Sequence, residues 1–230
     1  DEAIESAIAV EQKIKNNSAG KLAGMVVAIK DVLAFKDHPL TCSSNILKNF
    51  TSLYTATVVQ KLIDEDAIII GKTNCDEFAM GSSNENSAFG NVLNSVDKTR
   101  VPGGSSGGSA VAVAANLCDV SLGTDTGGSI RQPAAFCGIF GLKPTYGRVS
   151  RFGLTAFASS FDSIGPFSRN VEDAALVMEV ISGKDLNDST SIEKEIQDFT
   201  SSLSRDKKFK IGIPKEYFAD GLDEEIKTAI

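Results

Sequence analysis

Histidine is nearly absent from this 230-residue sequence, which contains only His38, and its four cysteines form no C-x-x-C pair. A structural zinc site needs four closely spaced nitrogen or sulfur ligands, so the sequence argues against one and we expect no metal site. The Ser–Asp–His order of an α/β-hydrolase also places the histidine after the nucleophile, whereas His38 precedes every serine motif described below. A histidine-based triad is therefore excluded within this chain.

Long apolar runs and clusters of positive charge are missing as well. No stretch reaches the roughly 18 apolar residues that a membrane-spanning helix needs. The first residues, 1–5, have neither the basic nor the apolar part of a signal peptide. The net charge is −7 with scattered basic residues, which argues against direct binding to the phosphates of nucleic acid. We expect a soluble protein that needs a partner for any contact with RNA.

The composition fits one ordered α/β domain that spans residues 1–230. Hydrophobic residues make up 42% of the chain, which is enough for a substantial core. The surroundings of Cys118 and Cys137 are apolar, as expected for reduced thiols in a core. We therefore expect the protein to reside in the cytoplasm or in the interior of an organelle.

Hydrophobic periodicity predicts alternating helices and strands. A spacing near the helical period predicts helices, and short β-branched runs predict buried strands. We expect a mostly parallel sheet from this alternation. The predicted helices are 1–16, 56–65 and 171–181, and the predicted strands are 25–29, 67–70 and 209–213.

Two glycine-rich loops that carry serine are the most informative feature of the chain. The first is Val101–Ser109, which contains Ser105 and leads directly into an apolar helix, and the second is Gly123–Ser129. Glycine at this density lets backbone N–H groups approach a ligand where a side chain would clash. The pair of loops indicates acyl-transfer chemistry.

Three shorter patterns do not carry a function. Gly71-Lys72-Thr73 resembles the end of a phosphate-binding loop, but the glycine that opens such a loop is replaced by Asp66. Gly103–Gly107 fits the nucleophile elbow G-x-S-x-G, which the missing histidine excludes. Ser191–Lys194 has the serine–lysine spacing of penicillin-binding enzymes, but it lies in a highly charged stretch where chance explains it better.

A serine nucleophile without histidine needs another base, and Lys30 is the best placed candidate. It ends the predicted strand 25–29, and ligand sites in open α/β sheets lie at the carboxyl ends of strands. Burial lowers the pKa of a lysine because it disfavours the charged form. The neutral amine that results can act as a base. The competing interpretation is an ordinary lysine at a strand end that pairs with Asp31.

Lys30, the Gly103–Ala110 loop and the Gly123–Pro133 segment together resemble the amidase signature family in residue type, order and spacing. The resemblance covers nearly the whole chain. It implies the amidase signature fold, with a central mixed, mostly parallel sheet covered by helices on both faces. It also implies a catalytic triad in which Ser129 is the nucleophile, Ser105 the bridging serine after a cis peptide bond, and Lys30 the base.

The resemblance assigns roles to the turn around the nucleophile as well. The backbone N–H groups of Thr126, Gly127, Gly128 and Ser129 would form the oxyanion hole. Asp125 and Arg131 flank this turn, and we expect them to pair across it and support its shape.

Four further stretches resemble the glutamine-hydrolysing subunits of tRNA-dependent amidotransferases. These are residues 76–85, 141–151, 156–160 and 211–218. This resemblance implies glutamine as the substrate and subunits B and C as partners in a heterotrimer that serves translation. The tRNA would be bound mainly through the B subunit, which would also bind ATP and magnesium, so no cofactor is expected in this chain.

Two alternatives stay open, namely a stand-alone amidase of the same family and a non-catalytic scaffold. The presence of all three triad residues argues against the scaffold. The chain also begins close to the lysine strand and stops at Ile230, whereas the family continues into segments that grip glutamine. We therefore expect a domain that is incomplete at both ends. The choice between glutamate and aspartate on tRNA belongs to the partner subunits.

Overall fold

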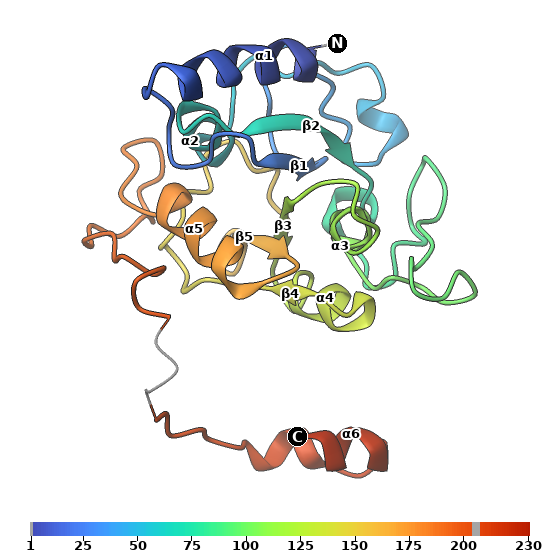
Figure 1. Ribbon diagram of the computed structural model, residues 1–230. Helices are drawn as coiled ribbons and strands as arrows, with labels where there is room; N and C mark the ends of the chain where they lie inside the picture. Colours follow the sequence, from blue (N-terminus) through green and yellow to red (C-terminus); the bar gives the residue numbers. More distant parts are fainter. Residues whose placement is uncertain (1, 204–207) are drawn as a thin grey trace. The chain divides into compact units, whose positions relative to one another are not determined.

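A five-stranded sheet in the order β2–β1–β3–β5–β4 organises the fold of this computed structural model, which describes residues 2–203 and 208–230 (Figure 1). β1 pairs in parallel with β2 and β3, whereas β5 pairs antiparallel with β3 and β4. Four strands thus share one direction, which confirms the predicted mixed, mostly parallel sheet. The strands are β1 Val26–Lys30, β2 Ile68–Thr73, β3 Val120–Asp125, β4 Phe140–Gly141 and β5 Ser163–Ser168.

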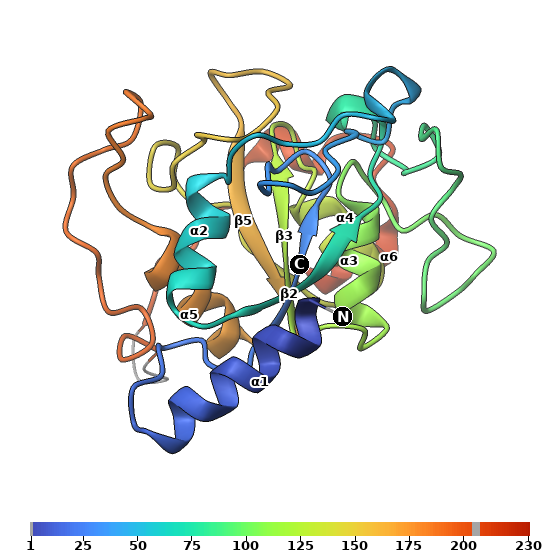
Figure 2. The same cartoon turned by 90° about the horizontal axis from the view of Figure 1, so that it is seen from above.

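Helices cover both faces of this sheet, as predicted. Seen from above, α2 and α5 lie on one side of the strands and α3 and α4 on the other, while α1 packs along β2 (Figure 2). The helices of this part are α1 Glu2–Lys15, α2 Thr57–Asp64, α3 Gly107–Ala114, α4 Arg131–Cys137 and α5 Val171–Ile181, with the short 3-10 helices η1 Asn45–Leu47 and η2 Glu77–Ala79. Among the described residues, none of the helices has the length and apolar character needed to cross a membrane.

Side chains of different size occupy the two faces of the sheet. On β1, Val27 and Ile29 pack into the core with α2 and α5, whereas Ala28 packs with α3 and α4. Successive residues of a strand point to opposite faces, which explains this division. The α3–α4 side is built largely from alanine, as at Ala110 and Ala134, so these helices lie close to the strands. This close layer carries both serine loops.

The predicted elements agree with the observed ones to within a few residues. The predictions 1–16, 25–29, 56–65 and 67–70 became α1, β1, α2 and β2, with residue 1 outside the described part of the chain. The helix predicted at 171–181 has those same bounds. It begins there because Asn170 accepts the N–H of Asp173 and so caps the helix.

The strand predicted at 209–213 is wrong, because this segment is irregular in the structure. Its apolar residues, such as Phe209 and Ile211, are exposed. A strand needs a neighbour for its backbone hydrogen bonds, and alternating apolar residues alone do not provide one.

The chain divides into two compact units, 1–200 and 201–230, the second of which contains η3 Lys215–Phe218 and α6 Glu224–Ala229. One domain over 1–230 stays a prediction.

Candidate active site

Lys30 lies fully buried at the carboxyl end of β1, where three hydroxyl groups surround its amine. Its Nζ lies 2.7 Å from Ser105 Oγ, 2.9 Å from Ser106 Oγ and 2.8 Å from Thr124 Oγ1. The ordinary pairing with Asp31 is absent among the described contacts, since Asp31 binds Thr41 and Lys72 instead. The structure thus joins Lys30 to the first serine loop.

The parallel pairing of β1 and β3 explains this meeting. In the register of the two strands Ile29 lies opposite Leu122, so Lys30 and Thr124 reach the same edge of the sheet. The first serine loop enters α3, which packs on both strands and carries Ser105 and Ser106 to that edge. Open α/β sheets bind ligands at this edge.

Burial lowers the pKa of Lys30 from its ordinary value to about 8, because an ammonium ion loses its hydration there. Cys75 and the nearby acids Asp76, Asp125 and Asp162 oppose this effect, since negative charge favours the ammonium form. A lysine with this pKa is partly neutral near physiological pH. It therefore has a lone pair with which to accept a proton.

The hydroxyl protons around Lys30 are not equivalent. Ser106 Oγ donates to the carbonyl oxygen of Thr124 and accepts its N–H, so its own proton is engaged. Ser105 Oγ makes no hydrogen bond other than that to Lys30 with any residue that the structure describes. A neutral amine has two N–H groups and one lone pair, so it can donate to Ser106 and Thr124 and accept from Ser105.

Ser129 lies half-buried in the turn between β3 and α4. Within residues 2–203 and 208–230, its hydroxyl group forms no hydrogen bond with Ser105 or Lys30. The Gly104–Ser105 peptide bond is cis, as the resemblance implies. The structure therefore connects Lys30 directly to Ser105 and leaves the Ser105–Ser129 contact open.

Asp125 and Arg131 form the ion pair that we expected across this turn. Arg131 Nε lies 3.1 Å from one carboxylate oxygen and Nη2 lies 3.0 Å from the other. The fully buried Asp125 also accepts the N–H groups of Gly128 and Ile130 at 2.9 and 3.1 Å. Burial by itself raises the pKa of Asp125, but these hydrogen bonds outweigh it and hold the pKa below its ordinary value.

The four predicted oxyanion donors do not behave alike. The N–H of Gly128 donates to Asp125, which takes it out of the predicted set, because the buried carboxylate recruits the nearest backbone donors. The N–H groups of Thr126, Gly127 and Ser129 donate no hydrogen bond to another described residue. Three of the four donors thus remain available to a ligand.

Two buried acids near the site were not predicted. Asp162 accepts the hydroxyl of Thr126 and the N–H groups of Phe157 and Ala158, and so holds the first residue of the serine turn. Asp76 accepts the N–H of Asn84 at 3.0 Å, and its own N–H donates to the carbonyl of Ser105 at 3.2 Å. Asp76 lies in residues 76–85, and the family resemblance of that stretch was the one sign in the sequence that pointed to this acid.

Gly104 lies against the side chain of Asp76 and the backbone of residues 83 and 84. A Cβ atom at this position would lie 2.2 Å from Asp76 Oδ2 and 2.9 Å from two backbone nitrogens. No side chain fits there, so glycine is required before Ser105. The need for glycine in the first loop thus comes from close packing.

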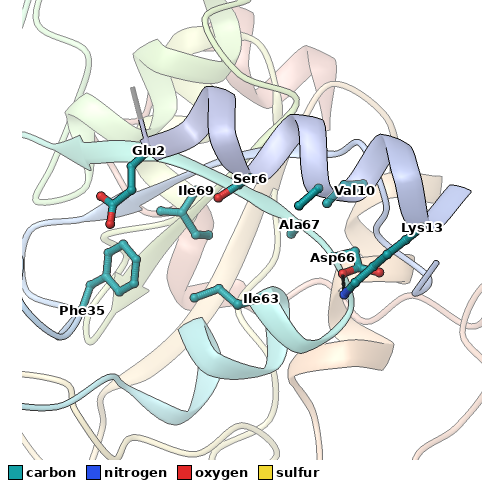
Figure 3. Close-up of a pocket in the computed structure, with 10 residues that line it drawn as sticks. Glu2, Ser6, Val10, Lys13, Phe35, Ile63, Asp66, Ala67 and Ile69 are labelled. Carbon is teal, nitrogen blue, oxygen red and sulfur yellow. Dashed lines mark hydrogen bonds and ion pairs between the residues drawn. The ribbon is translucent and has the colours of Figure 1, made fainter. Parts of the chain in front are cut away.

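A separate cavity lies beneath α1 and contains none of the predicted site residues (Figure 3). It has a volume of about 350 Å³ and is lined by residues of α1, α2 and β2, by Asp66 and Ala67 in the turn between α2 and β2, and by Phe35. Its one internal ion pair joins Lys13 to Asp66. The described residues contain no group of three His, Cys, Asp or Glu side chains that could hold a metal ion.

A buried lysine bonded to a serine, beside a glycine-rich serine turn at the carboxyl edge of an α/β sheet, is the arrangement of a serine hydrolase that works without histidine. Residues 1–230, which are the whole chain, match the family model described as Amidase. The chain belongs to the amidase family.

The chain is similar to A subunits of amidotransferases and to a peptide amidase. The chain is 57% identical over 229 residues to the A subunit of the glutamyl-tRNA(Gln) amidotransferase of Chlorobium limicola, covering 98% of this chain and 48% of that protein. The solved A subunit of the glutamyl-tRNA(Gln) amidotransferase from Thermotoga maritima is 55% identical with a TM-score of 0.76, covering 77% and 39% of the two chains. The native peptide amidase of Stenotrophomonas maltophilia is 36% identical with a TM-score of 0.83, covering 88% and 43%. The chain spans about half the length of the curated relatives it matches.

Proposed function

We propose that this protein is the glutaminase subunit of a tRNA-dependent amidotransferase. It would hydrolyse glutamine and release ammonia for converting Glu-tRNA(Gln) to Gln-tRNA(Gln), or Asp-tRNA(Asn) to Asn-tRNA(Asn). The observation that supports it most is the buried amine of Lys30, 2.7 Å from Ser105 Oγ and with a pKa of about 8. The chain that carries it is 57% identical to the A subunit of the glutamyl-tRNA(Gln) amidotransferase of Chlorobium limicola.

In the proposed acylation step, neutral Lys30 accepts the proton of Ser105 while Ser105 accepts that of Ser129. Ser129 Oγ then forms a bond to the side-chain carbonyl carbon of glutamine. When the tetrahedral intermediate collapses, the C–N bond breaks and the proton returns through Ser105 to the departing ammonia. Water subsequently attacks the γ-glutamyl ester, which releases glutamate and restores Ser129.

The proposed oxyanion hole consists of the N–H groups of Thr126, Gly127 and Ser129. Each donor of this kind is typically worth about 2.7–4 kcal/mol of transition-state stabilisation. Gly128 belongs to the support of the turn instead, since its N–H binds Asp125. The missing Ser105–Ser129 hydrogen bond does not oppose this mechanism, because such contacts are often loose before the substrate binds.

The partners follow from the same proposal. The B subunit would bind tRNA, ATP and magnesium and amidate the activated acceptor, and the C subunit would complete the heterotrimer. The net charge of −7 supports this division, because a chain with this charge repels phosphate. As a translation enzyme, the complex would work in the cytoplasm or in an organelle.

A stand-alone amidase is the second candidate. The TM-score of 0.83 with a peptide amidase favours it, because a chain with a similar fold serves an enzyme of that name. The identity of 57% with the Chlorobium limicola amidotransferase relative, against 36% with the peptide amidase, favours the first proposal.

Mass spectrometry of the full-length protein after incubation with a reactive glutamine analogue tests the proposal. We expect one covalent adduct on Ser129 that is absent from Ser129→Ala and unchanged in Ser18→Ala, which alters an exposed serine. Glutamine hydrolysis that rises sharply on addition of the B subunit would support the amidotransferase role. Efficient hydrolysis of simple amides with no response to the B subunit would instead support the stand-alone amidase.

A further inference from the structure

The side chain of Gln132 links three segments of the site. Gln132 lies in the first turn of α4, immediately after the serine turn. Its Oε1 accepts the N–H of Gly104 at 2.9 Å, and its Nε2 donates to the carbonyl oxygen of Ser82 at 3.0 Å. One carboxamide thus uses its donor and its acceptor on two different loops.

These contacts close a ring around Ser105. From Gln132 the ring passes to Gly104 and along the chain to Ser105, whose carbonyl accepts the N–H of Asp76. It then follows the segment of Asp76 to Ser82 and returns to Gln132. Ser105 is consequently held through Gly104, which precedes it, and through its own carbonyl group. Gln132 is the residue of this ring that lies in α4, the helix that follows Ser129.

The first loop leaves room for this side chain. A Cβ atom on Gly103 would lie 2.8 Å from Gln132 Oε1 and 2.9 Å from the Cα atom of Pro133. Gly103 also has a φ of +82°, a conformation that favours glycine. Gly103 therefore permits α4 to approach the loop closely enough for the Gln132–Gly104 hydrogen bond.

We propose that Gln132 is a positioning residue that sets the separation between the nucleophile Ser129 and the bridging Ser105. The proposal rests on the proposed function, since it assumes that a proton passes from Ser129 to Ser105. These two serines share no hydrogen bond among the described contacts, so the segments that carry them must fix their geometry. Gln132 ties those two segments together through a hydrogen bond.

The rate at which a fluorophosphonate modifies Ser129 in the full-length protein tests this role, because the probe needs an activated serine but not glutamine recognition. In that reaction the Oγ–P bond forms, the P–F bond breaks, fluoride leaves and the serine proton passes through Ser105 to Lys30. Gln132→Met removes both hydrogen bonds at similar length. Gln60→Met is the matched control, because Gln60 makes one exposed hydrogen bond on α2.

We expect Gln132→Met to lower the maximal labelling rate about 100-fold, the typical effect of a misplacement of about 1 Å. The half-saturating probe concentration, the melting temperature and the pH midpoint of labelling should stay near those of the wild type, because Lys30 keeps its contacts. Gln60→Met should label at the wild-type rate. Gln132→Glu keeps the acceptor that faces Gly104 and should be at least about tenfold faster than Gln132→Met.

Three results would overturn the proposal. The first is a Gln132→Met rate within about twofold of Gln60→Met. The second is a loss of labelling rate that comes with a shifted pH midpoint, or with a lower melting temperature, in both Gln132 variants. Such a result would show that the substitutions disrupt the fold in general. The third is an unlabelled Ser129 in the wild type, which would remove the proposed nucleophile as well. In the first two cases the labelled wild type leaves the proposed function standing.

Discussion

At Lys30, the environment determines how a side chain that is normally a cation behaves. Three hydroxyl groups take the place of water around the amine, and none of them carries a charge. Hydroxyl groups can donate as well as accept, so they solvate the neutral and the protonated amine alike. The amine of Lys30 can therefore be neutral or protonated in the same set of hydrogen bonds.

The pH dependence of fluorophosphonate labelling should report the protonation state of this lysine. With a pKa of about 8 for Lys30, the neutral fraction rises as the pH increases through 8. We expect the rate at which the fluorophosphonate labels Ser129 to rise about tenfold per pH unit below pH 8 and to level off above about pH 9. Measuring the labelling rate from pH 6 to 10 checks this.

Two variants identify the titrating group. Lys30→Ala should abolish the labelling, whereas Lys72→Met should keep the midpoint near pH 8. Lys72 is the useful comparison because burial lowers its pKa as well, while it contacts Asp31 rather than a serine. If the pH midpoint of labelling moved in Lys72→Met, the titrating group would be Lys72 and the assignment to Lys30 would be wrong.

Replacing Asp125 by Asn should reduce stability as well as activity. The variant loses the charge that binds Arg131 and that holds two backbone N–H groups in the turn. Charged hydrogen bonds contribute about 1.5–3 kcal/mol each, and exposure of Arg131 weakens part of this, so we expect a loss of about 2–4 kcal/mol. Urea unfolding measures it.

The comparison for this variant is Asp97→Asn, which changes an aspartate that is half exposed. We expect it to stay within about 0.5 kcal/mol of the wild type. Equal stability of Asp125→Asn and Asp97→Asn would sink the supporting role of Asp125.

The sequence pointed to Lys30, Ser105 and Ser129 because each lies in a local motif with recognisable chemistry. Asp76, Asp162 and Gln132 escaped prediction because their contacts join segments far apart in the chain. Gly128 was assigned to the oxyanion hole for its position in the loop, and only three-dimensional geometry shows that Asp125 takes its N–H. Local pattern indicates the candidate reactive groups, whereas the residues that support them depend on tertiary contacts.

At the scale of elements, the best predictions were the helices and strands with a clear period and a local end signal. α5 is the clearest case, because its apolar period begins directly after a capping asparagine. β4 was missed, since it has only two residues. The strand at 209–213 failed because a strand depends on its neighbour as much as on its own residues.

Removing the cap of α5 should lower stability modestly. Asn170→Ala loses the hydrogen bond to the N–H of Asp173, which measures 2.7 Å. Such a loss costs about 1 kcal/mol, equivalent to a melting temperature lower by about 2–4 °C for a domain of this size. Asn170→Ser keeps a capping oxygen and should melt close to the wild type. Identical melting of the Ala and Ser variants would show that the cap contributes nothing.

At the scale of the whole molecule, the charge predicts where tRNA does not bind. The 230 residues carry 23 basic and 30 acidic side chains and no basic cluster. We expect photocrosslinks between tRNA and the assembled enzyme to map outside residues 1–230, because these residues supply little attraction for phosphate. Peptide mapping after crosslinking provides the measurement. Strong crosslinks to several lysines of this segment would contradict the proposed division of labour.

The difference in side-chain size between the two faces of the sheet determines which substitutions each strand position tolerates. On the α2–α5 side, Val27 and Ile29 have neighbours of similar bulk, so exchange among branched aliphatic residues conserves volume. Ala28 on the other face is buried against the alanine-rich helices α3 and α4, so a larger side chain would have to push them away from the strand. Neighbouring positions of one strand should therefore differ sharply in a saturation library, with position 28 almost invariant and positions 27 and 29 permissive.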